Sequence, residues 1–209
     1  VVFYNKAIEL DPENAELYYS RANFFESREM YNFAIEDYGK ILALDEKDFY
    51  ARVRRGELFN KASDFTSAAK DFFNALEILN SPEIQSSEII HLKREKTNFR
   101  EISYYKWYPK DCLVDAYIGK GEAYFGLKDY DTALEDFNRA AEIEEYDYRV
   151  FYNRARVYEE TGNFEAALAD YEKTLKRAPK NKSAKDGKKR MKKAVKLAAK
   201  QSRKKTKGA

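Results

Sequence analysis

The sequence predicts an all-α protein, an α-solenoid of helix–turn–helix repeats, and three observations support this fold class. One spacing of small and aromatic residues recurs four times with a period of 34 residues. Each period divides into two runs of about a dozen residues with apolar side chains at i, i+3, i+4 and i+7, the spacing of an amphipathic helix. Glycine and proline number only eight and four, so few positions interrupt a helix. A fixed period of this length is typical of stacked supersecondary units.

The repeat is clearest in residues 15–48, and it returns in 49–82, 114–147 and 148–181. Aromatic residues at the eleventh, seventeenth and twenty-fourth positions fill the space between helices. Small residues at the eighth and twentieth positions let the two backbones approach closely, and they are Ala22, Ala34, Gly56, Ala68, Gly121, Ala133, Ala155 and Ala167. One repeat cannot bury its apolar face alone, so we expect neighbouring repeats to share a continuous core.

The other segments depart from this pattern. Residues 1–14 match only the second half of a repeat, which predicts a half repeat that consists of its second helix. Residues 83–113 break the period, and we expect an irregular, partly helical insertion there; a degenerate helical pair that continues the stack is the alternative. Asp111 is a reasonable N-cap for the helix that follows. Residues 182–200 predict a basic capping helix, and 201–209 lack an apolar face and are expected to be disordered.

Charge divides the chain into two parts of opposite sign. The net charge is +3, yet residues 182–209 carry thirteen basic side chains and one acidic one, which leaves 26 basic and 35 acidic side chains in residues 1–181. No run of about 18 apolar residues occurs, so no membrane-spanning segment is predicted. The single cysteine excludes an internal disulfide and fits a reducing compartment, so we expect a cytoplasmic protein. Because the sequence begins inside a helical pattern without a methionine, we also expect a preceding segment.

The candidate groups for catalysis or metal binding do not form a recognised site. His91 and Cys112 are the only histidine and cysteine, and they stand 21 residues apart in the irregular segment. The zinc-protease, paired-cysteine, phosphate-loop and serine-hydrolase motifs are missing from the sequence. The carboxylates are spread along helix faces, where solvation accounts for them. We therefore predict a protein that is not an enzyme and that uses no cofactor or metal.

One polar pattern recurs in all four repeats. The seventh position is always basic and the twenty-third is always aspartate, which predicts ion pairs between the packed helices. The predicted pairs are Arg21–Asp37, Arg55–Asp71, Lys120–Asp136 and Arg154–Asp170. We expect these partly buried pairs to fix the register of the helices. Anion binding by the basic column is the weaker alternative, because the acids are equally regular.

These features together resemble the tetratricopeptide repeat, whose units are helix–turn–helix hairpins of 34 residues. Four full units match, and they cover 136 of the 209 residues. The resemblance implies a right-handed superhelix with a capping helix at its C-terminal end. It also implies a non-enzymatic scaffold or adaptor that binds a peptide or helix of a partner protein in the concave groove of the array. The identity of the partner and the oligomeric state stay open.

In this family the first helix of each repeat lines the groove, chiefly through its second, fifth, ninth, twelfth and thirteenth positions. Carried over by position, the resemblance implies a set of groove candidates, namely Tyr19, Asn23, Glu26, Tyr50, Val53, Glu57, Asn60, Ile118, Glu122, Arg149, Tyr152 and Arg156. Aromatic rings, amides and carboxylates suit an extended or helical peptide. Some relatives clamp a partner's C-terminal carboxylate with basic residues and asparagines. Tyr19 and Arg54 occupy two of those places here, so we do not expect such capture.

The alternative function is binding of nucleic acid or anionic surfaces through the basic C-terminal segment. Its lysines and arginines would attract phosphates without sequence preference, and anionic lipid headgroups equally. The anion-binding candidates are Lys188, Lys189, Arg190, Lys192, Lys193, Arg203, Lys204 and Lys205. The segment lacks aromatic side chains for base stacking, and a solvated capping helix accounts for the same charges.

Overall fold

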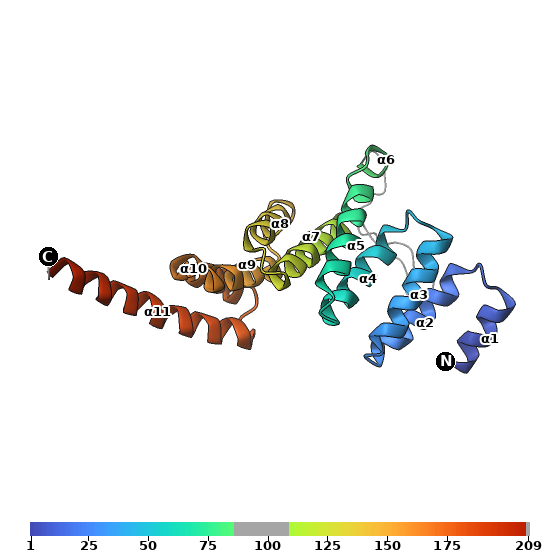
Figure 1. Cartoon of the computed structure of the whole chain (residues 1–209), viewed down its shortest axis with the longest axis horizontal. Coiled ribbons are helices and arrows are strands. Elements are labelled where there is room, and N and C mark those ends of the chain that lie inside the picture. Colours follow the sequence, from blue (N-terminus) through green and yellow to red (C-terminus); the bar gives the residue numbers. More distant parts are fainter. Residues whose placement is uncertain (86–108, 208–209) are drawn as a thin grey trace. The chain divides into compact units, whose positions relative to one another are not determined.

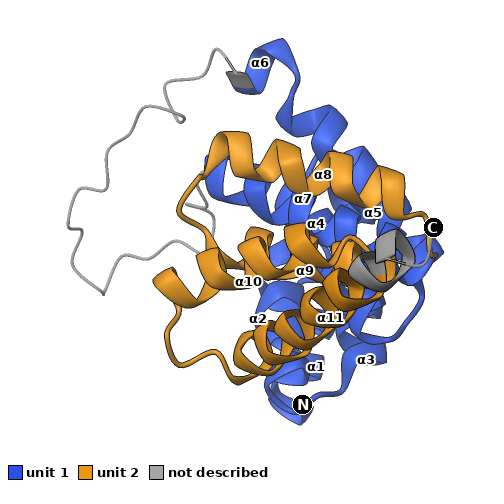
Figure 2. Ribbon diagram, turned by 90° about the vertical axis from the view of Figure 1, so that its left-hand side faces the viewer, with its two compact units in different colours: residues 1–127 blue, residues 128–209 orange. Residues whose placement is uncertain are grey.

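The computed structural model describes residues 1–85 and 109–207, and all regular elements within these ranges are α-helices (Figure 1). The chain divides into two compact units, Val1–Leu127 and Lys128–Ala209 (Figure 2). Within each unit successive helices pair into hairpins that pack on one another, so the predicted all-α solenoid of helix–turn–helix repeats is confirmed. None of the described helices is long and apolar enough to cross a membrane.

Unit 1 contains two complete hairpins and the first helix of a third. Its helices are α1 Val2–Leu10, α2 Ala15–Ser27, α3 Tyr31–Leu44, α4 Phe49–Lys61, α5 Phe65–Leu79, α6 Pro82–Gln85 and α7 Pro109–Gly126. The hairpins are α2 with α3 and α4 with α5, and α7 packs against both helices of the second hairpin. We call the first helix of a repeat its A helix and the second its B helix, so α2, α4 and α7 are A helices.

Unit 2 begins with a B helix and ends with a long basic helix. Its helices are α8 Tyr130–Ile143, α9 Tyr148–Glu160, α10 Phe164–Arg177 and α11 Lys182–Lys207. The A helix α9 packs against α8 and forms a hairpin with α10, and α11 packs on α10. The order of packing therefore follows the order of the chain, as a repeat array requires.

Local sequence signals start and turn these helices. Asp48 accepts a hydrogen bond from the backbone N–H of Ala51 at 2.9 Å and so caps α4. Equivalent caps are formed by Asn14, Asp64, Asp129, Asp147, Asn163 and Asn181. After the A helix, the fifteenth position of all four repeats has positive φ, at Glu29, Ser63, Lys128 and Gly162. One left-handed residue therefore ends the A helix in each repeat, a common way for helices to stop.

The A helix of the third repeat is longer than the period predicts. α7 begins at Pro109, five residues before the predicted start of that repeat. Asp111 therefore lies inside the first turn, and the prediction that it is the N-cap is wrong. Proline suits a first turn because an N–H there would have no partner within the helix. Of the predicted insertion, residues 83–85 and 109–113 are helical, and residues 86–108 lie outside the described residues.

The cores form where the small and aromatic positions predicted them. Ala22 at the eighth position and Tyr38 and Phe72 at the twenty-fourth are fully buried. The backbone of α7 lies directly on the Phe72 ring, because a Cβ at Gly119 would be only 2.2 Å from it. Cys112 of α7 joins the same core at 1% exposure, and burial raises the pKa of its thiol to about 12. Close packing thus fixes α7 against the second hairpin.

The capping helix α11 sits on α10 by a similar close approach. Gly187 and Met191 are buried there, and a Cβ at Gly187 would lie 2.4 Å from the Tyr171 ring. The helix continues to Lys207, so the disorder predicted from Gln201 onward is wrong for the described part of that segment. Lysine, arginine and glutamine have high helix propensity, and no glycine or proline occurs in residues 201–207. Local preference therefore extends the helix beyond its packed part.

Ion pairs join the A and B helices of three repeats, as predicted. The pairs are Arg21–Asp37, Arg55–Asp71 and Arg154–Asp170, each with a shortest N–O distance of 2.6 Å. The three aspartates are buried, so the geometry of these pairs constrains the helix register. Lys120 and Asp136 belong to different units, and the fourth pair stays a prediction.

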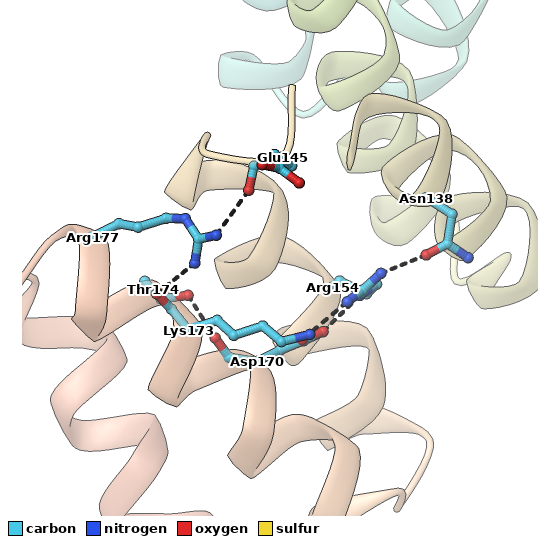
Figure 3. A network of polar contacts seen from close by, with 7 residues as sticks. All are labelled: Asn138, Glu145, Arg154, Asp170, Lys173, Thr174 and Arg177. Atoms are coloured by element: carbon cyan, nitrogen blue, oxygen red, sulfur yellow. Dashed lines mark hydrogen bonds and ion pairs between the residues drawn. The ribbon is translucent and has the colours of Figure 1, made fainter. Parts of the chain in front are cut away.

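In unit 2 the ion pair extends into a polar network (Figure 3). Arg154 donates a further hydrogen bond to Asn138 of α8 at 2.6 Å, so one guanidinium ties α9 to both neighbouring helices. Arg177 of α10 donates to the backbone oxygen of Glu145, which precedes α9, at 2.9 Å. These contacts hold the A helix of unit 2 between two B helices.

Candidate peptide-binding surface

Three of the predicted groove residues of unit 1 are buried. Tyr19, Val53 and Ile118 all occupy the fifth position of an A helix, and they are 3%, 2% and 5% exposed. Tyr19 also donates its hydroxyl hydrogen to Asp48 at 2.6 Å, at the cap of the next A helix. Because the fifth position packs between neighbouring repeats, the prediction that these three side chains face a ligand is wrong.

The A helices α2 and α4 meet in a hydrogen-bonded group of Glu26, Tyr38, Arg54 and Glu57, which we call the inner cluster. Arg54 of α4 donates to Glu26 of α2 at 2.5 Å and also to Glu57, one turn further along α4. Tyr38 of α3 donates its hydroxyl hydrogen to Glu26 at 2.8 Å. The side chains of Glu26, Arg54 and Glu57 keep 12%, 27% and 29% exposure. One guanidinium therefore serves two carboxylates at a place that solvent still reaches.

Burial dominates the electrostatics of the inner cluster. It raises the pKa of Glu57 to about 6 although Arg54 opposes this shift, and the nearby charge of Asp115 raises the pKa further. Burial also disfavours the charged form of Arg54, but Glu57 and Glu26 hold the pKa of Arg54 above its ordinary value. Arg54 thus stays protonated, and an ionised Glu57 gives the cluster an excess of negative charge.

Further contacts tie the three A helices of unit 1 together. Tyr50 of α4 stacks on Tyr19 of α2 with 5.8 Å between ring centroids, and burial raises the pKa of Tyr50 to about 12. Asn60 of α4 donates its side-chain N–H to the backbone oxygen of Gly119 in α7 at 2.8 Å. Asn23 of α2 is exposed. The predicted residues at the second, ninth and twelfth positions of unit 1 therefore reach the surface or the contacts between A helices.

Repeat register places more carboxylates on the same side of these helices. Glu122 of α7 occupies the ninth position, as Glu57 does in α4, and Glu16 and Asp115 occupy the second position of α2 and α7. We call the set of carboxylates on this side of unit 1 the acidic face, made of Glu16, Glu26, Glu57, Asp115 and Glu122. Arg54 and Lys61 contribute positive charge to this side, so the carboxylates outnumber them.

The A helix of unit 2 carries arginines at the corresponding positions. Arg149 at the second position is exposed and binds Asp147 at 2.6 Å. Arg156 at the ninth position donates to Asn153 at 3.1 Å and lies over the half-buried ring of Tyr152. At the ninth position α9 therefore presents the cation Arg156, where α4 and α7 present Glu57 and Glu122.

A second tyrosine–glutamate–arginine group lies where α11 meets α9 and α10, and we call it the cap cluster. Tyr171 of α10 donates to Glu159 of α9 at 2.7 Å, and Arg190 of α11 donates to both carboxylate oxygens at 2.7 and 2.9 Å. Although burial opposes the shift, the hydrogen bonds from Arg190 and Tyr171 lower the pKa of Glu159. The side chain of Arg190 is 57% exposed, so this pair is well solvated.

Two of the predicted anion-binding residues already bind carboxylates of unit 2. Arg190 binds Glu159, and Lys188 binds Glu172 at 3.0 Å, so both fasten α11 to the helices beneath it. Three others, Lys189, Lys192 and Lys193, are exposed. The remaining three, Arg203, Lys204 and Lys205, lie in α11, but their side chains are outside the described residues.

Two observations on the described residues concern metal binding and thiol reactivity. Among them, no group of three or more histidine, cysteine, aspartate or glutamate side chains could hold a metal ion. Cys112 is buried with a raised pKa, so its reactive thiolate is disfavoured. His91 lies outside the described residues.

Sequence reasoning missed Arg54 as a site residue, because the sixth position does not recur as a basic residue. A signal was nevertheless present. Tyrosine stands at the twenty-fourth position only in the two repeats that have glutamate at the twelfth, which are the repeats of Glu26 and Glu159. The other two repeats have phenylalanine there, at Phe72 and Phe137. The tyrosine hydroxyl thus donates to the glutamate in the repeats that have one. Because this glutamate lies at the boundary between repeats, a basic side chain of the following helix can pair with it.

Comparison with known proteins supports the assignment of the repeats. Sequence profiles of the tetratricopeptide repeat match residues 3–35 and 112–180. The chain is 27% identical over 191 residues to DnaJ homolog subfamily C member 3 of Gallus gallus, covering 83% of this chain and 38% of that protein. It is 29% identical to stress-induced-phosphoprotein 1 of Caenorhabditis elegans and 28% identical to the Hsp70-Hsp90 organizing protein of Triticum aestivum. Those matches cover 81% and 84% of this chain and 53% and 31% of the relatives.

Solved structures show the same fold. PilW, a type IV pilus biogenesis factor, superposes with a TM-score of 0.70 at 15% identity, covering 94% of this chain and 77% of PilW. YrrB, described as a TPR protein with an unusual peptide-binding site, superposes with a TM-score of 0.59 at 20% identity, covering 90% of this chain and 81% of YrrB. The recurring 34-residue pattern, the helix hairpins and the two profile matches together show that the chain contains tetratricopeptide repeats.

Proposed function

We propose that the chain is a non-enzymatic interaction scaffold that binds a peptide segment of a partner protein along the A helices α2, α4 and α7. The observation that carries this proposal is the way polar side chains on these helices hold one another. Arg54 joins α2 to α4, and Asn60 joins α4 to α7. Groups that are fixed before binding lose little conformational entropy when a ligand arrives, which favours binding at such a surface.

The chemistry of this surface suits a peptide. The exposed amide of Asn23 can both donate to and accept from a peptide backbone. Glu26 and Glu57 accept hydrogen bonds, and both keep some exposure to solvent. Because the carboxylates of the acidic face outnumber the cations beside them, the surface favours a segment that contains lysine or arginine.

The relatives support a role in protein interaction in general terms. One carries the name Hsp70-Hsp90 organizing protein, and YrrB is described as having a peptide-binding site. The chain spans about a third to a half of the length of the curated relatives it matches. Capture of a C-terminal carboxylate stays disfavoured, since Arg54 is already held by Glu26 and Glu57. The cytoplasmic location expected from the sequence stays a prediction.

The test is selection of binders from a random peptide library displayed on phage, with the full chain as bait. The enriched peptides should lose at least about tenfold affinity for a double variant, Asn23→Ala with Glu57→Gln. The matched control is Asn32→Ala with Glu77→Gln, which changes the same residue types at exposed positions of B helices. Peptides that bind the first variant as tightly as the unmodified chain would rule out this surface as the binding site.

A further inference from the structure

The capping helix α11 carries a row of lysines on the side turned away from α10. We call this row the lysine stripe, and it consists of Lys189, Lys192, Lys193, Lys196 and Lys200. Relative to the first member the others follow at +3, +4, +7 and +11, so all five share one helix face. All five are exposed, whereas Gly187 and Met191 on the opposite side are buried. Buried residues on that opposite side and the flanking Lys188 and Arg190 anchor the helix, so the stripe is left for another contact.

The molecule already shows what α11 cations bind. Arg190 at the edge of the stripe holds Glu159, a twelfth-position glutamate that also accepts from Tyr171. Unit 1 presents the same arrangement in its first repeat, where Glu26 at the twelfth position accepts from Tyr38 and from Arg54. An A-helix carboxylate steadied by a tyrosine is therefore a site that this chain fills with a basic side chain.

The lysine stripe and the acidic face match in charge and in size. Residues 182–209 carry thirteen basic side chains and one acidic one, while residues 1–181 carry an excess of nine acidic ones. From Lys189 to Lys200 the stripe extends about 17 Å, because an α-helix rises about 1.5 Å per residue. Three helices packed side by side at about 8 to 10 Å cover a similar distance. One α11 can thus lie across α2, α4 and α7.

We propose that the lysine stripe of one copy docks on the acidic face of a second copy, so that the chain associates head to tail. This inference rests on the proposed function, because it uses the same A-helix surface and names one occupant for it. The two patches are different surfaces, so the contact is heterologous and adds copies until a ring closes or a filament forms. Since the lysines of the stripe are exposed, salt should weaken the contact.

The first experiment is sedimentation velocity of the nuclease-treated full chain at increasing concentration. The weight-average mass should rise to at least twice that of the monomer at about 0.05 M NaCl and return to the monomer value at about 0.5 M. A stripe variant changes the five lysines of the stripe to glutamine. Its control changes five exposed lysines elsewhere, Lys40, Lys47, Lys70, Lys110 and Lys176, to glutamine. The control should still associate and the stripe variant should stay monomeric.

A mixing experiment then tests which surfaces meet. A face variant carries Glu16→Gln, Glu57→Gln, Asp115→Asn and Glu122→Gln, and it keeps an intact stripe. The stripe variant keeps an intact acidic face. Each variant alone should be monomeric, and the equimolar mixture should form a heterodimer that grows no further, since only one complementary pair of surfaces remains. Circular dichroism of both variants confirms that they are folded.

Several outcomes would overturn the inference. They are a monomeric chain at low salt, association that the stripe variant retains, association that nuclease abolishes, and a mixture that stays monomeric. The last two would indicate binding of nucleic acid by α11 and a contact through other surfaces, respectively. Library peptides that still bind the A helices of a monomeric chain would leave the proposed function standing while the self-association fails.

Discussion

The inner cluster and the cap cluster are built on the same tyrosine–glutamate pair, but the cation comes from different places. In unit 1 it is Arg54, at the sixth position of the next A helix and 27% exposed. In unit 2 it is Arg190, at the ninth position of α11 and 57% exposed. At the sixth position α11 has Gly187, which lies directly on the tyrosine ring. The twelfth-position glutamate is therefore paired with a cation in two ways. In unit 1 the cation is partly buried and shared with a second carboxylate, and in unit 2 it is solvated and lies near a close backbone contact.

Replacing Arg54 should have the largest effect, because it leaves two partly buried carboxylates without their common cation. Removing one member of a buried ion pair costs about 3 to 5 kcal/mol, and the remaining exposure of this cluster reduces the expected loss of unfolding free energy to about 2 to 3 kcal/mol for Arg54→Met. Urea denaturation measures it. Arg52→Met is the control on the same helix, since Arg52 donates only to the backbone oxygen of Glu46 in an exposed contact. Equal losses in the two variants would contradict the difference in burial.

Gly187→Ala should destabilise the cap, although alanine favours helices over glycine. The new methyl group would meet the Tyr171 ring, and overpacking of this kind costs about 1 to 3 kcal/mol. Gly39→Ala is the matched control, because a Cβ there has only an ordinary contact with Arg55 at 3.6 Å. That control should gain up to about 1 kcal/mol from helix propensity. A gain in thermal stability for Gly187→Ala would show that α11 can shift away from Tyr171 without loss.

The inner cluster should also make stability depend on pH. The pKa of Glu57 is raised from 4.5 to about 6, so the folded state binds this proton more tightly than the unfolded state. Ionisation of Glu57 therefore lowers the free energy of unfolding. This loss is absent below pH 4.5, grows as the pH rises toward 6, and is complete above it. Allowing for its exposure, the advantage of Glu57→Gln over the unmodified chain should grow by about 1 kcal/mol between about pH 4.5 and 7.5. An advantage that stays constant or shrinks would contradict this sign.

Arg190→Met should have the smallest effect of the four. Its ion pair with Glu159 is mostly solvated, and such pairs contribute about 0.2 to 1 kcal/mol. Thermal unfolding at low and high salt measures the loss, which should diminish as salt screens the pair. Lys193→Met is the control on the same helix. A loss as large as that of Arg54→Met would mean that exposure does not separate the two clusters.

The sequence predicted the array because its main determinants recur. Small residues such as Ala22, aromatic residues such as Phe72 and the pairs of the Arg55–Asp71 type return at fixed offsets, and each repetition strengthens the prediction. The identification of buried ion pairs rested on the same periodicity. A recurring pattern carries no information about features that occur in one repeat alone. For this reason the start of α7 at Pro109 and the helical residues after Gln201 were missed.

The candidate surface was predicted less well than the fold. The fifth positions were assigned to a ligand, but an apolar side chain such as Val53 gains more by burial between repeats than by exposure. Arg54 was overlooked because one of its partners, Glu26, lies on α2, 28 residues away in the sequence. The ninth and twelfth positions survive as surface candidates since their polar side chains can satisfy hydrogen bonds at the boundary between repeats.

Because Cys112 is buried, its reactivity reports the local opening of α7. A thiol with 1% exposure and a pKa near 12 reacts with a disulfide reagent only after α7 has separated from α5. Because the chain has one cysteine, the labelling rate at equilibrium yields the free energy of that opening with no competing signal. The separation of α7 within unit 1 can thus be followed at the natural cysteine, without a tag or a substitution, while global unfolding is recorded separately.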